Sequence, residues 1–181
     1  MSRLRAWGAP DAALASTTPA DALVPEATER WVRAVDVDAP PALLWRWLCQ
    51  LRAAPYSYDW IDNLRRRSPQ QLTPGLERLE VGQKLLITFR VAAFTPGEEL
   101  TILTRPRSRL LPPFAVSYLI DPHGGGSRLT AHVRVGQPSA LPRPVARAAL
   151  GALCVGDLVM MRKQLLNLKR LAERDVPRGP A

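Results

Sequence analysis

The sequence PVARAALGALCVGDLVMMRKQLLNLKRLAER, residues 144–174, decides the fold of this chain. Its apolar residues recur in alternating steps of four and three, the spacing that places side chains on one face of an α-helix. A long helix with one apolar stripe needs a broad surface to cover that stripe. We expect one amphipathic helix, straight or bent near Gly156, whose buried stripe is formed by Cys154, Leu158, Met161, Leu165, Leu168 and Ala172.

The segments before this helix follow the two-residue period of β-strands. Strands that follow one another through short turns pair antiparallel, and a curved antiparallel sheet offers the surface that the helix needs. The expected fold class is therefore α+β, with such a sheet wrapped around the long C-terminal helix. The expected strands are residues 30–38, residues 85–91, a strand holding Leu100 and Ile102, residues 114–120, and a strand returning through Leu129 to Val135.

Two short apolar helices are expected at the edge of this sheet. The first follows Pro40 and Pro41, and proline is favoured in the first turn of a helix. Its inward face holds Leu44, Trp47, Leu48 and Leu51. The second runs from about Tyr58 to Arg67 and turns Trp60, Ile61 and Leu64 inward.

The returning strand has two chemically different faces. Leu129, Ala131, Val133 and Val135 are expected to face the core, while Arg128, Thr130, His132 and Arg134 are expected to face solvent.

The domain prediction has three parts. Residues 1–26, rich in Ala, Pro, Thr and Asp, show neither period and are expected to form a disordered leader that is dispensable for folding. Residues 27–174 are expected to form one ligand-binding domain. Residues 175–181 are expected to form a disordered tail.

The net charge of +9 invites a nucleic-acid function, but the arginines are scattered along every segment. We therefore expect only weak nucleic-acid binding without sequence preference. Two clusters, Arg65–Arg67 and Arg105–Arg109, are expected near one end of the sheet. These clusters either form a solvated basic rim, or they attract an acidic ligand or an anionic membrane with which the protein makes transient contact.

Composition also predicts the compartment and the absence of cofactors. The first residues lack the continuous apolar core of a secretory signal, and Arg, Asp or Pro interrupts each long apolar run, so no transmembrane segment is expected. Cys49 and Cys154 fall in apolar helical patterns and are expected to be reduced and buried. No metal-ligand spacing and no phosphate-binding glycine loop is present in the sequence. We expect a cytoplasmic protein without metal or cofactor.

Four stretches match the pattern of a known family. They are residues 35–48, YSYDWIDNL at 56–64, Val81-Gly82, and the final helix at 156–173. On these stretches the chain from about Glu29 to Glu173 resembles the START/SRPBCC helix-grip superfamily, in particular its bacterial polyketide cyclase/dehydrase or lipid-transport-like branch. Members of this branch carry glycines just before the YSYDW segment, where this chain has RAAP at 52–55. The resemblance implies a helix-grip fold, and it assigns no cyclase catalytic residue to this chain.

A sheet that grips a helix usually leaves a cavity between them, and aromatic and apolar side chains are the candidate contacts there. A ligand pocket is mostly apolar with a few polar groups, and tyrosine supplies both. The alternative for each residue is that it fills the core. The candidate ligand-binding residues are Tyr56, Tyr58, Trp60, Phe89, Phe114, Tyr118, Met161 and Leu165.

The sequence favours a carrier or sensor that binds a small hydrophobic or aromatic molecule. Two alternatives stay open, a polyketide cyclase/aromatase-like enzyme and a protein- or membrane-interaction module. No Ser-His-Asp or Cys-His arrangement is visible, so no catalytic residue is assigned. A titratable group pointing into the cavity would favour the enzyme, whereas a filled core with a large exposed apolar patch would favour the interaction module.

Overall fold

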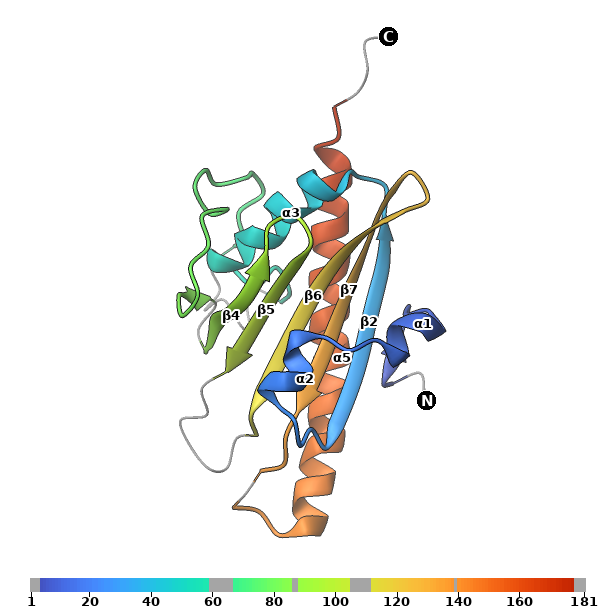
Figure 1. The fold of residues 1–181 in the computed structure, drawn as a ribbon, viewed down its shortest axis with the longest axis vertical. Helices are drawn as coiled ribbons and strands as arrows, with labels where there is room; N and C mark the ends of the chain where they lie inside the picture. Colours follow the sequence, from blue (N-terminus) through green and yellow to red (C-terminus); the bar gives the residue numbers. More distant parts are fainter. Residues whose placement is uncertain (1–3, 59–66, 86–87, 105–111, 139, 178–181) are drawn as a thin grey trace.

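The long helix predicted at the end of the chain is α5, which runs without interruption from Arg143 to Arg174. The computed structural model describes residues 4–58, 67–85, 88–104, 112–138 and 140–177. Gly151 and Gly156 lie inside the helix without dividing it, and Figure 1 shows a straight helix. Leu158 of the expected stripe is half-buried, and the buried members are Cys154, Met161, Leu165, Leu168 and Ala172.

A curved sheet wraps around one side of α5 (Figure 1). Its strand order is β1-β2-β7-β6-β5-β4-β3, and all neighbouring strands are antiparallel except β1, which runs parallel to β2. The predicted α+β fold is confirmed, and the parallel β1 is an addition to the predicted antiparallel sheet. The strands are β1 (Ala6–Trp7), β2 (Glu29–Val37), β3 (Lys84–Leu85), β4 (Phe89–Thr95), β5 (Glu99–Thr104), β6 (Phe114–His123) and β7 (Gly126–Val135).

The β6–β7 hairpin forms the centre of the sheet. Its pairing runs from Phe114 opposite Val135 to His123 beside the turn. Gly124 and Gly125 have φ of 56° and 82°, the positive values that a two-residue hairpin turn requires. The inward face predicted for β7 is confirmed, because Leu129, Ala131, Val133 and Val135 are all 0% exposed.

The prediction of one strand over residues 85–91 is wrong. Leu85 in β3 lies opposite Phe89 in β4, so the chain reverses between them. Residue 87, expected on the same strand, lies outside the described residues. A two-residue period fits both a continuous strand and a tight hairpin, and the sequence here offers no glycine or proline to distinguish them.

The first short helix is α3 (Pro41–Cys49), followed by a 3₁₀ turn at Gln50–Arg52. It buries its predicted inward face and packs against the C-terminal end of α5, where the Trp47 indole donates a hydrogen bond to Asp175 at 3.1 Å. Val176 also packs against the core. The second predicted helix falls mostly on residues 59–66, and the end of the predicted tail on residues 178–181, and both lie outside the described residues.

Residues 4–26 form secondary structure packed on the sheet, which differs from the predicted disordered leader. Strand β1 extends the sheet at the edge of β2, with the Val32 amide donating to the Arg5 carbonyl at 2.8 Å. Two short helices follow, α1 (Asp11–Ala15) and α2 (Pro19–Leu23), and α2 contacts β5, β6 and β7. The leader therefore covers part of the outer face of the sheet (Figure 1).

Asp21 of α2 makes the polar contact that fastens the leader to the outer face of the sheet. Its carboxylate accepts hydrogen bonds from Arg134 at 2.6 and 3.1 Å and from Arg30 at 2.8 Å. Burial alone would raise the pKa of Asp21, but the bonds from Arg134 and Thr18 outweigh burial and lower it to about 2. Asp21 is therefore ionised at neutral pH.

The leader also corrects the prediction that one face of β7 meets solvent. Thr130, His132 and Arg134 are 2–3% exposed. Burial, with the nearby charge of Arg134, lowers the pKa of His132 to about 4, so this imidazole is neutral at pH 7.

Asp21→Asn should lower the free energy of unfolding by about 3 kcal/mol at pH 7, because it leaves the buried guanidinium of Arg134 without its anionic partner. Urea denaturation measures this change, and Asp11→Asn, an exposed acid on α1, is the control. The folded-state pKa of Asp21 lies below its unfolded value of 3.8. The stabilisation is therefore present above about pH 4 and is lost as pH falls through about 2. Equal stabilities for the two variants would show that the Asp21–Arg134 pair does not stabilise the fold.

Candidate functional site

A cavity of about 370 Å³ lies between the inner face of the sheet and α5. Strands β4, β5 and β6 form one wall, α5 forms the opposite wall, and the chain just after α3 contributes Pro55 and Ser57. Most of the lining is apolar. The other lining residues described are Thr88, Phe89, Ile102, Phe114, Val116, Tyr118, Asp157, Met160, Met161 and Gln164.

The structure brings some of the predicted contacts together and separates others. Phe89, Phe114, Tyr118 and Met161 line the cavity. Their role as ligand contacts stays a prediction.

Of the remaining four candidates, three do not line the cavity and the fourth is not among the described residues. Tyr56 is 1% exposed and packs edge-on against Trp47, with ring centroids 6.0 Å apart, so it belongs to the core. Leu165 is 0% exposed and also joins the core cluster. Tyr58 is half-buried and is not among the lining residues, and Trp60 lies outside the described residues.

An aromatic cluster forms one end of the apolar wall. Phe89 and Phe114 meet edge-to-face with centroids 5.9 Å apart, and Phe114 meets Trp31 in the same way at 6.2 Å. Each pair gains about 1 kcal/mol beyond its buried area. Strands β4, β6 and β2 supply one ring each, so these contacts join three strands into one wall.

A hydrogen-bonded pair crosses the cavity from sheet to helix. The Tyr118 hydroxyl donates to Oε1 of Gln164 at 2.7 Å, and Nε2 of Gln164 donates to the Pro55 carbonyl at 2.7 Å. Burial raises the pKa of Tyr118, and the negative charge of Asp157 raises it further, so the hydroxyl stays protonated. Its proton is committed to Gln164, while its oxygen retains the capacity to accept a hydrogen bond from a ligand.

Asp157 brings a titratable group to the same cavity. Its Oδ2 lies 3.2 Å from Nη2 of Arg33, and the two side chains are 7% and 0% exposed. Burial raises the pKa of Asp157 to about 6, and Arg33 offsets part of the rise. The Arg33 guanidinium lies over the Trp31 ring, 5.9 Å from its centroid, which places the ion pair next to the aromatic cluster.

Neither Asp157 nor Gln164 was among the candidate residues predicted from the sequence. Both residues border the apolar stripe of α5, since Asp157 and Gln164 are seven positions apart and Met161 lies between them. The sequence signal that could have identified them is a pair of polar residues, two helical turns apart, beside a buried apolar stripe.

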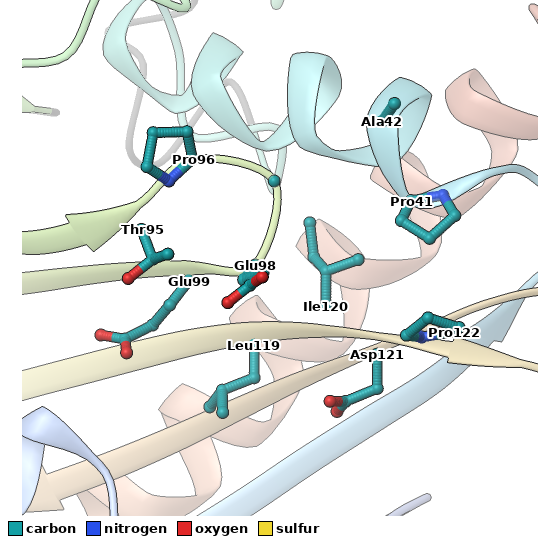
Figure 2. A pocket seen from close by; sticks show the side chains of 11 residues that line it. Pro41, Ala42, Thr95, Pro96, Glu98, Glu99, Leu119, Ile120, Asp121 and Pro122 are labelled. Carbon is teal, nitrogen blue, oxygen red and sulfur yellow. The ribbon is translucent and has the colours of Figure 1, made fainter.

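A larger hollow, about 550 Å³, lies on the surface between α3, the β4–β5 turn and the end of β6 (Figure 2). Figure 2 shows Ile120 pointing toward α3, while Leu119 and Asp121 point to the opposite side of β6. The hollow therefore follows both faces of a strand and does not converge on one enclosed volume. The cavity under α5 is the better candidate, because its lining is more apolar and carries only a few polar groups.

No protein-family model matches this sequence, and no match is found among curated proteins. Protein MLL2253 from Mesorhizobium loti has a similar structure, with 19% identity, coverage of 82% of this chain and 100% of that chain, and a TM-score of 0.50. BexL, a di-domain ARO/CYC from the BE-7585A biosynthetic pathway, is 16% identical, with coverage of 87% of this chain, 54% of that chain and a TM-score of 0.51. These likenesses show the fold, which is the helix-grip fold that the sequence resemblance implies.

The Asp157 carboxyl should titrate with a pKa of about 6, because burial disfavours its charged form. Carbon-13 NMR of aspartate-labelled protein measures this pKa, with Asp157→Asn identifying the signal. The folded-state pKa lies above the unfolded value of 3.8. The group therefore stabilises the fold below about pH 4, and this contribution is lost as pH rises through about 6. An Asp157 signal that titrates at or below pH 4 would contradict the buried, desolvated site.

Proposed function

We propose that the protein binds a small, mostly apolar molecule in the cavity between the sheet and α5, as a carrier or sensor. The observation that supports this proposal is an apolar cavity of about 370 Å³ that holds one buried carboxyl group and one tyrosine hydroxyl. Ligand pockets are typically about 300–1,000 Å³, apolar, and equipped with few polar groups. A ligand with one hydroxyl or amine fits best, because Asp157 and the Tyr118 oxygen accept hydrogen bonds.

The proposal places the protein in the cytoplasm, as the sequence predicts. Cys49 and Cys154 are both free and buried, which suits a reducing compartment. No cofactor is part of this proposal. In the described part of the chain, no group of three His, Cys, Asp or Glu side chains is placed to hold a metal ion.

The probe pair 2-naphthol and naphthalene tests the proposal, since the two molecules differ by one hydroxyl. Both should raise the melting temperature because they bind the folded state, and 2-naphthol should bind about tenfold more tightly through one added hydrogen bond. Val116→Phe fills the cavity and should abolish both shifts.

Leu119→Phe is the matched control on the opposite face of β6 and should leave the shifts unchanged. Calorimetry gives the two affinities. Equal responses from the two variants would place the binding site elsewhere, and no response from wild-type protein would reject the proposal.

A cyclase/aromatase-like enzyme is the second candidate, and one observation favours it. Asp157 is a titratable group on the cavity wall with a pKa raised to about 6. A carboxylate with this pKa is a suitable general base near neutral pH. It would take a proton from the carbon beside a ligand carbonyl, leaving an enolate, and return the proton later.

Hydrogen–deuterium exchange at the activated methylene of 2-tetralone distinguishes an enzyme from a carrier. If Asp157 acts as a base, wild-type protein should accelerate the exchange by at least about 100-fold, as positioned general bases do. Asp157→Asn should remove the acceleration while 2-tetralone still binds. Binding without accelerated exchange in wild-type protein would leave the carrier function and reject the enzyme.

A further inference from the structure

The first half of α5 extends an apolar surface into solvent. Val145, Leu153, Val155 and Val159 are 51%, 37%, 48% and 48% exposed. Leu4 of the leader is 47% exposed, and its carbonyl accepts a hydrogen bond from Cys154 at 3.5 Å, which places this residue beside the same stretch of helix. Together these five residues form the exposed apolar face of α5.

Helix geometry places most of this face opposite the buried stripe. Val145, Ala152 and Val159 are spaced by seven positions and therefore lie along one line of the helix. Gly156 is one turn from Ala152, and a Cβ added to Gly156 would meet no other atom within 4 Å. The buried residues of this half, Cys154 among them, face the leader and the sheet on the other side.

The exposed charges of α5 within residues 143–163 are all positive. Arg162 and Lys163 are exposed at the C-terminal end of the apolar face, while Arg143 and Arg147 are exposed at the start of the helix, on the side of the buried stripe. Asp157 is the acid within residues 143–163, and it is buried against Arg33. This part of α5 therefore combines an exposed apolar face with nearby basic side chains, which is the chemistry that anionic lipid headgroups and acyl chains complement.

We propose that this face docks the protein on the surface of an anionic lipid membrane. By length and composition α5 could cross a bilayer, with a mean hydropathy of 1.5 over its most apolar stretch. Its second half, however, is held in the grip of the sheet, with Leu165, Leu168 and Leu171 all 0% exposed. The first half of α5 therefore lies on the membrane surface, while its second half remains packed in the folded domain.

Charge also argues against a second copy of this chain as the occupant. An antiparallel pair of α5 helices in contact through this face would bring together two helix segments whose exposed charges are all positive. The like charges would repel, and the described surface of the helix brings no exposed acid to this half to offset them. An anionic membrane meets the same cations with attraction.

The docking face also lies next to the cavity. Met160 lines the cavity and directly follows Val159 of the exposed face, and Leu153 lies two turns before it on the same side of the helix. Docking goes beyond the proposed ligand binding, and it would bring the cavity close to a source of apolar molecules.

Vesicle flotation tests the docking face. Wild-type protein should bind vesicles of phosphatidylcholine and phosphatidylglycerol at a ratio of about three to one, and should bind pure phosphatidylcholine at least about tenfold more weakly. The double variant Val155→Gln, Val159→Gln should lower binding to the mixed vesicles at least about tenfold, because it removes exposed apolar area. Val81→Gln is the matched control, since Val81 is 67% exposed and lies outside α5.

Three further results decide the proposal. The double variant should retain the 2-naphthol thermal shift of wild-type protein, so failure of docking and failure of ligand binding are separate outcomes. Unchanged vesicle binding in the double variant would overturn the docking face. A different set of results would show that a second copy covers the face. In that case wild-type protein would sediment as a dimer and would not bind the mixed vesicles, and the double variant would sediment as a monomer.

Discussion

The apolar stripe of α5 must be covered, and the rest of the structure depends on that constraint. The sheet covers the stripe only by curving, which brings the inner residues of β5, β6 and β7 onto one helix. Curvature leaves the outer face and the β2 edge of the sheet open. The leader closes both, with β1 on the edge and Asp21 on the outer face, so that the sheet is packed on two sides.

The cavity lies beside the stretch of α5 where polar side chains border the apolar stripe. Between Cys154 and Leu165 the helix presents Asp157, Met160 and Gln164 toward the sheet, and the aromatic cluster of Phe89 and Phe114 stands opposite. Polar side chains cannot interlock with aromatic rings as Leu and Val do. They need polar partners. The ion pair with Arg33 holds Asp157 at the wall, and the hydrogen bonds to Tyr118 and Pro55 hold Gln164 there. The same residues that prevent a closed core therefore provide the polar groups of a binding site.

The sequence predicts the buried face of a segment wherever the spacing of apolar residues within that segment determines it. The alternation of β7 and the four–three steps of α5 determine which side chains face the core, and the structure confirms the inward face of β7 and most of the buried stripe of α5. Contacts between distant segments were not predictable. Nothing in the composition of the leader shows that Asp21 pairs with Arg134, which lies 113 positions later, and without that pair His132 looks exposed.

The residues of the candidate site were predictable under the same condition. Phe89, Phe114, Tyr118 and Met161 were selected because aromatic and apolar residues at inward positions of strands and helix face the same space. Asp157 was missed because its partner Arg33 lies on β2, far from α5 in the sequence, and only the fold reduces that separation to a short distance. A single sequence gives no measure of that distance.

The same helix serves two surfaces. Inward-facing residues from Asp157 onward line the cavity or pack on the sheet, while the start of the helix exposes apolar side chains with basic side chains nearby. A helix needed only for the core would gain nothing from exposed valines, because polar residues there would cost no burial.

Methyl NMR tests the central claim, that the space between the sheet and α5 receives the ligand. The chain has three methionines, and two of them, Met160 and Met161, line the cavity. In protein labelled with carbon-13 at the methionine methyls, saturation with 2-naphthol should shift both signals and produce contacts between these methyls and the naphthol ring. Binding of 2-naphthol that leaves both methyl signals unshifted would contradict the account.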